Sequence, residues 1–302
     1  MSAAKSNIAS GFATNRVVLG TVQFGLDYGI SNTAGKVPLE EVCRILAYAH
    51  AKGVTMLDTA AAYGDSETVL GKSLQETGLS FQIISKLPPT VTARDVRRTV
   101  EASLEKLGAD KLYGYLFHSF NSYKEHPAVL EQLCLLQEEG LIAQVGFSLY
   151  HPAEALELLD KNITFGLTQF PYNIFDRRFD LVLDKLQAAG IETHVRSVFL
   201  QGLFFIEAAQ LPPYFSKVAG KIAALQQLAQ KANIPLEALL MHFVLQVPGI
   251  NNLVIGVNSL KALKANLATS EYQAAIQYLL PELKRYEVTD EDILLPYKWK
   301  TS

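Results

Sequence analysis

The sequence has few cysteines, only two in 302 residues, and neither belongs to a Cys-x-x-Cys pair. Cys43 and Cys134 both fall within helical patterns, so we predict reduced thiols with no disulfide and no metal site. No apolar run is long enough for a membrane-spanning helix. The amino-terminal residues 1–16 also lack the apolar stretch of a secretory signal. We therefore expect a cytoplasmic protein without a membrane partner.

The chain also lacks a strong excess of charge of either sign. Its formal net charge is −3 and its isoelectric point is about 6.1. This balance gives no basic surface for nucleic acid, so we expect no nucleic-acid partner. Hydrophobic residues make up 49% of the chain and charged residues 19%, which is typical of a globular protein with a sizeable core.

Eight short apolar segments rich in β-branched residues recur along the chain. They read as continuous apolar runs rather than strict alternation, which is typical of strands that are buried on both faces. We predict strands at residues 17–21, 54–58, 81–86, 112–118, 143–148, 165–170, 192–199 and 252–257.

Helical patterns separate these strands. In residues 38–53, for example, the apolar positions Val42, Ile45, Leu46 and Ala49 follow the spacing of one helix face, and Gly53 follows the end. Eight β–α units in about 250 residues predict an α/β protein with a single (β/α)8 TIM barrel and a C-terminal helical extension. We expect one domain over residues 1–302. An open doubly wound sheet is the alternative, but the Gly-rich phosphate loop that usually follows an early strand there is absent.

Four reactive residues fall at the carboxyl ends of neighbouring predicted strands, where barrel enzymes carry their active sites. Asp58 ends the second strand, Tyr63 lies in the loop after it, Lys86 ends the third strand and His118 ends the fourth. Each of them alone has an ordinary structural role, such as capping a helix or filling the core. Their common placement at one end of the barrel predicts a catalytic group.

The chemistry of this set is consistent with carbonyl polarisation. A phenol has an ordinary pKa near ~10, and we expect the Lys86 ammonium to lower the pKa of Tyr63 while Asp58 keeps the lysine charged. The His118 N–H can bind a carbonyl oxygen and hold it against the phenol. These groups supply no nucleophile to the carbonyl carbon, so a hydride must come from another molecule.

The sequence resembles the aldo-keto reductase superfamily from LGTVQFG (19–25) to Asn266. The stretch DTAAAYGDSETVLG is similar to the signature of the family's second strand, IISK to its lysine motif and YLFH to its histidine motif. The resemblance implies that Tyr63 is the general acid/base, that Lys86 and Asp58 tune it, and that His118 orients the carbonyl. It also implies that NAD(P)H, extended over the barrel mouth, donates the hydride.

The same resemblance implies a set of cofactor-binding residues. Ser148 and Gln169 would bind the nicotinamide carboxamide, although Leu149 stands where an asparagine is usual. Arg196 occupies the position of an aromatic residue that stacks on the nicotinamide, and a planar guanidinium can also stack. The complete set is Thr21, Ser148, Gln169, Arg196, Ser197, Leu200, Gly202, Gly256, Val257, Asn258, Ala262 and Asn266.

Residues 254–266 resemble the stretch that holds the adenosine half of the cofactor. The helix that follows the last strand would offer its first N–H groups to a phosphate. Ala262 replaces an arginine that often binds the 2′-phosphate, and Lys261 and Lys264 are candidates to substitute for it. We expect NADPH to be preferred, and NADH is possible.

The sequence therefore predicts an NAD(P)H-dependent carbonyl reductase acting on a small-molecule aldehyde or ketone, or oxidising the alcohol in reverse. Two alternatives remain: a non-redox barrel lyase or isomerase that uses Lys86, and a cofactor-binding regulatory subunit without turnover. Phe24, Tyr28, Phe120 and Tyr150 are the candidates for the substrate pocket. The substrate, the direction of reaction and the oligomeric state have no signal in the sequence.

Overall fold

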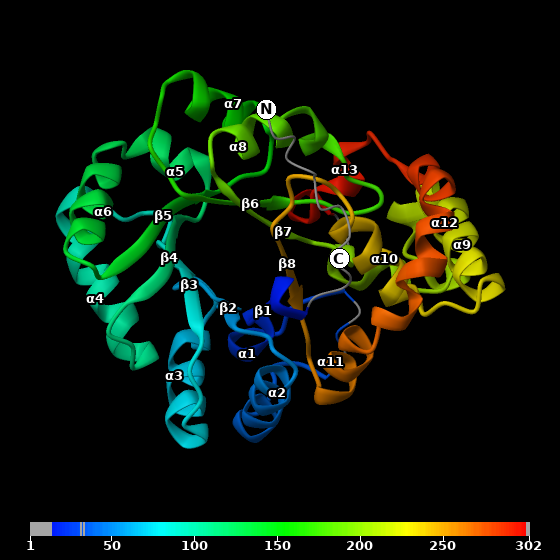
Figure 1. The fold of residues 1–302 in the computed structure, drawn as a ribbon, viewed down its shortest axis with the longest axis horizontal. Coiled ribbons are helices and arrows are strands. Elements are labelled where there is room, and N and C mark those ends of the chain that lie inside the picture. The colour runs from blue at the N-terminus through cyan, green and yellow to red at the C-terminus, as the bar shows by residue number, and fades with distance from the viewer. Residues whose placement is uncertain (1–13, 31, 33, 300–302) are drawn as a thin grey trace, which may run out of the picture.

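The computed structural model describes residues 14–30, 32 and 34–299. Eight parallel strands follow one another in chain order and close into a barrel (Figure 1), with β1 beside β8. The strands are β1 (Val17–Gly20), β2 (Met56–Asp58), β3 (Gln82–Lys86), β4 (Leu112–Phe117), β5 (Ile142–Ser148), β6 (Leu167–Pro171), β7 (Glu192–Arg196) and β8 (Asn252–Gly256). The predicted (β/α)8 barrel is thus confirmed.

Each predicted strand is present, and the boundaries differ by a few residues. The largest difference is in β7, which was expected over residues 192–199 and ends at Arg196. Ser197, the next residue, has a φ of +63°, a left-handed conformation that no strand accommodates. The chain therefore turns away from the barrel wall at the point where the cofactor-binding stretch was predicted.

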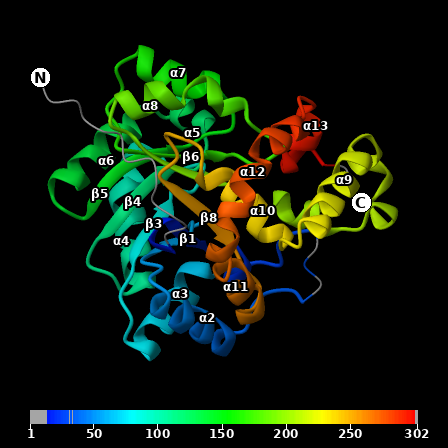
Figure 2. The same ribbon diagram turned by 45° about the vertical axis from the view of Figure 1, so that its right-hand side comes forward.

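Helices surround the strands, and the C-terminal helices gather beside α9 and α10 on one side of the barrel (Figures 1 and 2). The helices are α1 (Val22–Gly25), α2 (Leu39–Ala51), α3 (Ser66–Thr77), α4 (Val96–Leu107), α5 (Phe120–Glu125), α6 (Ala128–Glu138), α7 (Pro152–Asp160), α8 (Leu183–Ala188), α9 (Ser216–Lys231), α10 (Leu236–Leu245), α11 (Leu260–Leu267), α12 (Gln273–Leu283) and α13 (Glu291–Leu294). None of the helices in the described part of the chain is both long and apolar enough to cross a membrane.

The outer layer of the core forms where amphipathic helices cover the strands. In α2 the predicted stripe of Val42, Ile45, Leu46 and Ala49 is fully buried. Burying its valine, isoleucine and leucine side chains contributes about 1.5–3 kcal/mol each, which is the main force that holds the helix against the barrel. The helix ends are also as expected, since Gly53 has a φ of +84° just beyond α2.

A separate apolar layer fills the inside of the barrel. Ile84, Leu116 and Leu167 form this cluster, and each is fully buried. Because side chains alternate between the two faces of a strand, the residue two positions later points to the same interior. This spacing leads from the apolar layer to Lys86, His118 and Gln169, so the barrel core directly supports the polar groups above it.

Candidate active site

A cavity of about 620 Å³ opens at the carboxyl ends of the strands and continues towards α10 and α11. Its size is within the usual range for small-molecule sites. The wall is made by Gly20, Thr21, Val22, Gln23, Tyr28, Gly29, Asn32, Asp58, Tyr63, His118, Ser148, Tyr150, Gln169, Arg196, Ser197, Val198, Phe199, Gln201, Gly202, Phe205, Glu237, Val254, Ile255, Gly256, Val257, Asn258, Ala262, Ala265 and Asn266. Most of the predicted site residues therefore share one cavity.

The Asp58 carboxylate lies at the centre of a buried polar group. Its Oδ1 accepts a hydrogen bond from Lys86 Nζ and its Oδ2 accepts one from Gln169 Nε2, each with a donor–acceptor distance of 2.7 Å. Lys86 Nζ also donates to the Thr59 carbonyl at 2.8 Å. Lys86 is 1% exposed and is not part of the described cavity wall, so it acts on the site from behind Asp58 and Tyr63.

Tyr63 and His118 lie above this pair and face the cavity. Their ring centroids are 5.7 Å apart in an edge-to-face arrangement, and Lys86 Nζ is 5.1 Å from the centre of the Tyr63 ring. The structure thus brings the four predicted catalytic residues together.

The loop that carries Tyr63 is held by close backbone packing. A Cβ atom on Gly25 in α1 would lie 1.8 Å from the Tyr63 carbonyl oxygen and 2.6 Å from the Ser66 nitrogen. Thr21 Oγ1 donates to the Asp58 carbonyl at 3.0 Å and lies 2.9 Å from Ser66 Oγ. Only a glycine at position 25 lets α1 approach this loop, so Gly25 sets the height of Tyr63 in the cavity.

The protonation states differ in part from the sequence-based expectation. Loss of solvation raises the pKa of Tyr63, and the nearby Asp58 carboxylate raises it further. Burial lowers the pKa of Lys86, and Asp58 acts against that effect. The expectation that Lys86 would lower the pKa of Tyr63 is therefore wrong for this structure, because desolvation of the phenol dominates. Tyr63 is a protonated phenol at neutral pH and is suited to donate a proton.

His118 is also neutral. Burial lowers its pKa to about 4, and the positive charges of Lys86 and Arg196 contribute to this shift. Its Nδ1 is buried and has no hydrogen-bond partner among the described residues. A neutral imidazole carries one N–H and one lone pair, so His118 can donate to a carbonyl oxygen without adding a charge.

Gln169 provides a test of whether a nicotinamide would fit. Its nitrogen is used by Asp58, while its Oε1 is buried and has no partner in the described part of the chain. A buried acceptor without a donor is costly, and a carboxamide NH2 would satisfy it. Ser148 is also in the cavity wall, and its hydroxyl would suit the other end of the same amide. These groups fit a nicotinamide at this position, whereas Leu149 is fully buried.

Arg196 projects from the end of β7 and stacks on an aromatic residue. Its Cζ is 4.3 Å from the Tyr150 ring centre, and one of its terminal nitrogens donates to the Leu149 carbonyl at 3.2 Å. Tyr150 in turn meets Tyr297 edge to face, with ring centroids 5.0 Å apart. The guanidinium plane is therefore fixed in the cavity wall by the loop after β5 and the C-terminal segment.

The segment after Arg196 is conformationally unusual. Ser197, Leu200, Gln201 and Gly202 all have positive φ values, between +46° and +90°. Such strain in non-glycine residues concentrates at functional sites. Ser197 and Gly202 line the cavity, while Leu200 is fully buried and does not. Gln201 Nε2 donates to the Tyr28 hydroxyl at 3.0 Å, so this loop meets the loop after β1.

The far end of the cavity is formed by the start and inner face of α11. Gly256, Val257, Asn258, Ala262 and Asn266 line it, as predicted for residues of the cofactor site. The first N–H groups of α11 are already engaged, however: Leu260 N donates to Glu41 Oε1 at 2.7 Å, and Ala262 N donates to Ser259 Oγ at 3.2 Å. A phosphate at the start of this helix stays a prediction, and it would have to displace these two partners.

The two lysines suggested as substitutes for a phosphate-binding arginine at position 262 do not face the cavity. Lys261 and Lys264 are exposed and lie outside the described cavity wall. Lys264 Nζ lies 5.4 Å from the ring centre of Tyr48 on α2. A helix turns its side chains through about 100° per residue, so the neighbours of Ala262 point away from the side that Ala262 presents.

Two of the predicted substrate-pocket residues are placed elsewhere. Phe24 is fully buried in the main core, and Phe120 is 6% exposed and packs near Tyr123 behind β4. Tyr28 and Tyr150 do line the cavity. The sequence could not separate these cases, because an aromatic residue just after a strand can turn towards either the core or the mouth.

Thirteen residues of the described wall were not among the predicted site residues, and they include Gln23, Gln201, Phe205 and Glu237. Gln23 lies in α1, three residues after the end of β1, and has a buried Oε1 without a partner among the described residues. Its position shortly after the first predicted strand was a signal in the sequence that could have placed it at the barrel mouth. Glu237 gave none, because it lies at the start of α10, whose position relative to the mouth depends on the packing of the whole chain.

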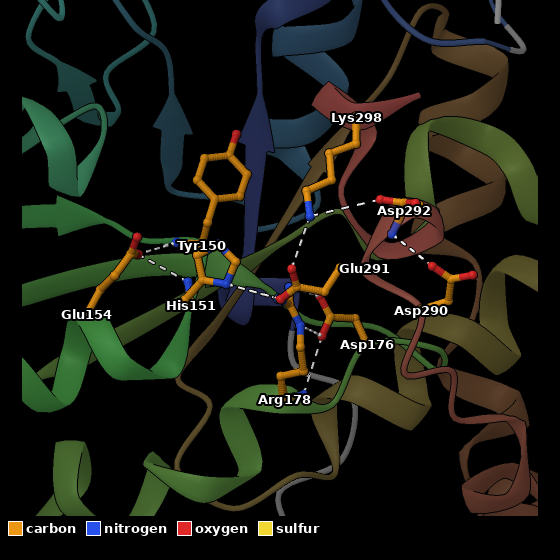
Figure 3. A network of polar contacts seen from close by, with 9 residues as sticks. All are labelled: Tyr150, His151, Glu154, Asp176, Arg178, Asp290, Glu291, Asp292 and Lys298. Atoms are coloured by element: carbon orange, nitrogen blue, oxygen red, sulfur yellow. Dashed lines mark hydrogen bonds and ion pairs between the residues drawn. The ribbon is translucent and has the colours of Figure 1, made fainter. Parts of the chain in front are cut away.

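A polar network holds the C-terminal segment against the loop after β5 (Figure 3). Glu291 Oε1 lies 3.2 Å from His151 Nδ1 and accepts a hydrogen bond from Arg178 at 2.8 Å, while Lys298 donates to Glu291 Oε2 at 3.1 Å. On the other side, Glu154 accepts from the backbone nitrogen of Tyr150 at 2.7 Å. The position of Tyr150 is thus set both by α7, which follows it, and by the C-terminal segment.

The described residues contain no group of three or more His, Cys, Asp or Glu side chains arranged to hold a metal ion.

Comparison with known proteins agrees with this geometry. The family model described as "Aldo/keto reductase family" matches residues 16–278. An aldo-keto reductase of Mycobacterium sp. (strain KMS) is 31% identical over 133 residues, which cover 41% of this chain and 47% of that protein. This chain thus aligns with about half the length of that relative. The NADH-specific methylglyoxal reductase of Escherichia coli (strain K12) is 28% identical over 184 residues, covering 51% of this chain and 55% of that protein.

A solved structure shows the same fold over most of the chain. The holo form of aldo-keto reductase AKR11C1 from Bacillus halodurans has a TM-score of 0.67 at 20% identity, covering 87% of this chain and 91% of that one. The likeness in fold and the family match over residues 16–278 lead to one conclusion. The chain belongs to the aldo/keto reductase family of oxidoreductases.

Proposed function

We propose that this protein is an NAD(P)H-dependent carbonyl reductase that converts a small aldehyde or ketone into the alcohol, or catalyses the reverse oxidation. One observation carries the proposal. Tyr63 and His118 face the same end of a cavity in which the buried amide oxygen of Gln169 lacks a partner among the described residues. A proton donor, a carbonyl ligand and an acceptor for a carboxamide therefore stand side by side.

The bound cofactor would supply a hydride to the carbonyl carbon. His118 donates its N–H to the carbonyl oxygen and holds that oxygen towards Tyr63. As negative charge develops on the oxygen, the Tyr63 phenol transfers its proton there, and the nearby Lys86 ammonium stabilises the resulting tyrosinate. Asp58 holds Lys86 in place. The product is the alcohol, and Tyr63 regains its proton from water.

Support for a nicotinamide cofactor comes from the residues that would hold it. Gln169 and Ser148 suit the carboxamide, and Arg196 presents a planar group fixed by Tyr150. The family resemblance makes NADPH the first expectation from the sequence. The relative named as an NADH-specific reductase belongs to the same family, so NADH remains a candidate as well.

Burial argues against Lys86 as a Schiff-base nucleophile. Lys86 is 1% exposed, bonds to Asp58 and Thr59, and lies outside the described cavity wall. A substrate carbonyl in the cavity would meet Tyr63 and His118 instead. Borohydride treatment in the presence of an aldehyde should therefore leave Lys86 unmodified.

Replacement of Tyr63 by phenylalanine tests the proposal. The wild-type protein should oxidise NADH or NADPH in the presence of at least one aldehyde from a chemically varied panel. Tyr63→Phe should lower kcat by about 10²–10⁴-fold, because only the proton donor is lost. Its affinity for the oxidised cofactor, measured by calorimetry, should stay within about threefold of wild type.

Near-wild-type turnover in the phenylalanine variant would refute the role of Tyr63. A wild-type protein that binds the cofactor but reduces no member of the panel would favour a regulatory subunit instead.

A further inference from the structure

The cavity has two chemically distinct ends, and this division determines where each half of a dinucleotide would lie. The hydride must be delivered beside Tyr63 and His118, so the nicotinamide belongs at the strand ends next to Gln169. The rest of the molecule can only follow the remaining length of the cavity. That length ends against α10 and α11, at Glu237, Ala262, Ala265 and Asn266.

The charges along the cavity are unevenly distributed. Arg196 is the sole arginine or lysine among the described residues of the wall, and it lies at the nicotinamide end on β7. At the far end the charged residue of the wall is Glu237. It is half-buried at the start of α10. Burial raises the pKa of the Tyr272 phenol, and the negative charge of Glu237 helps to raise it. Within the described residues the Glu237 carboxylate makes no hydrogen bond or ion pair.

Other groups near the far end add no positive charge to the cavity. The Glu41 carboxylate accepts from Leu260 N at the start of α11, and its other oxygen pairs with Arg44 at 2.8 Å. Ser259 Oγ accepts from Ala262 N. Of the N–H groups that could have bound a phosphate, two are therefore already engaged, one of them by a carboxylate.

NADH and NADPH differ only at this end of the molecule. The 2′-phosphate of NADPH adds nearly two negative charges and needs cations or free N–H donors. The ribose of NADH carries a free 2′-hydroxyl, which can donate to a carboxylate, and a Glu or Asp is the usual partner of that hydroxyl in dinucleotide sites of another fold. An unpaired carboxylate favours the hydroxyl and repels the phosphate.

We propose that Glu237 makes this site selective for NADH over NADPH. This inference rests on the proposed function, and it replaces the preference for NADPH that the sequence suggested. The carboxylate strengthens NADH binding, because it accepts a hydrogen bond from the ribose 2′-hydroxyl. It weakens NADPH binding, because it repels the 2′-phosphate.

Calorimetric titration with NAD⁺ and NADP⁺ tests this without turnover. Wild-type protein should bind NAD⁺ at least about tenfold more tightly than NADP⁺. Glu237→Gln keeps the size of the side chain and removes its charge. The ratio of the NAD⁺ affinity to the NADP⁺ affinity should therefore fall by about fivefold or more, mainly through tighter binding of NADP⁺. Glu40→Gln is the matched control, because Glu40 is exposed on α2 and outside the cavity wall. Its ratio should equal that of the wild type.

Equal or tighter binding of NADP⁺ by the wild type would overturn the selectivity and leave the reductase proposal standing. An unchanged ratio in a folded Glu237→Gln protein would remove Glu237 as the cause. If neither nucleotide binds, the reductase proposal itself fails and this inference fails with it. The wild-type ratio needs no variant, so it decides the selectivity even if Glu237→Gln does not fold.

Discussion

Gln169 Nε2 donates a hydrogen bond to Asp58 Oδ2 at a distance of 2.7 Å, and this bond joins β6 to β2 through the interior of the barrel. This bond orients the amide, because the nitrogen must face the carboxylate. The oxygen is then left for another donor. Gln169 thus links the proposed acid–base group to the place where a carboxamide would bind.

Replacing Gln169 by leucine should weaken binding of the nicotinamide half of the cofactor and leave binding of the other half unchanged. NAD⁺ should bind about 10-fold more weakly, because the carboxamide loses an acceptor and Asp58 loses a donor. ADP-ribose lacks the nicotinamide, so its affinity should be unchanged. Calorimetry with both ligands makes the comparison. Equal losses for the two ligands would mean that Gln169 supports the cavity as a whole rather than the nicotinamide.

Gly25→Ala should impair catalysis through the position of Tyr63. The added Cβ would lie 1.8 Å from the Tyr63 carbonyl oxygen, so the loop must move. A displacement of about 1 Å at a catalytic group can lower the rate by 10²-fold, and we expect kcat to fall by about this factor.

Gly220→Ala provides the control for that substitution. Gly220 lies within α9, and nothing lies within 4 Å of its added Cβ. This variant should keep full activity and gain about 0.5–1 kcal/mol of stability. Full activity in a folded Gly25→Ala protein would contradict the role of Gly25.

His118 should make the protein less stable in mild acid. Its folded-state pKa of about 4 is below the ordinary value of 6.5, so between these values the unfolded chain binds a proton that the folded protein does not. The free energy of unfolding should therefore fall as the pH drops from 6.5 towards 4, by at most about 3 kcal/mol from this residue.

Urea unfolding of the wild type and of His118→Gln across this range isolates the effect. The difference in unfolding free energy between the two proteins should change with pH as stated, since glutamine does not titrate. A difference that stays constant with pH would show that the His118 pKa is not lowered.

Arg196 should contribute to cofactor affinity through its planar group. Arg196→Ala should raise the dissociation constant of NAD⁺ by about 3–30-fold, the range expected for a stacked guanidinium. Arg196→Lys keeps the charge but not the plane, so it should recover only part of the loss. Arg98→Ala, on the exposed side of α4, is the control. An alanine variant with wild-type affinity would exclude Arg196 from the cofactor site.

The fold was predictable because its signals are local and repeat. Each strand is an apolar run, and each helix shows its own stripe and stop, as α2 does up to Gly53. Eight such units leave few ways to bury all these faces other than a closed barrel. The strand ends were less exact where backbone geometry decides the boundary, as at Ser197 after β7.

The candidate site was predictable where strand order alone places a residue. Asp58 and Lys86 end successive strands and His118 directly follows the next one, so the barrel brings them together whatever the loops do. Phe24 and Glu237 were misjudged or missed because their positions depend on the direction of a side chain and on helix packing. The pKa of Tyr63 was misjudged because desolvation depends on the full three-dimensional surroundings.

The network around Glu291 ties the C-terminal segment to the loop that carries Tyr150 (Figure 3). The proposed acid–base residues lie within residues 58–118, whereas Tyr150 is held by Glu154, Tyr297 and the network of Glu291 with His151. The residues proposed for the reaction and those that hold one wall of the pocket therefore come from separate parts of the chain. Exchanging residues 287–299 for those of a relative would be a way to redirect substrate choice while the reaction itself stays the same.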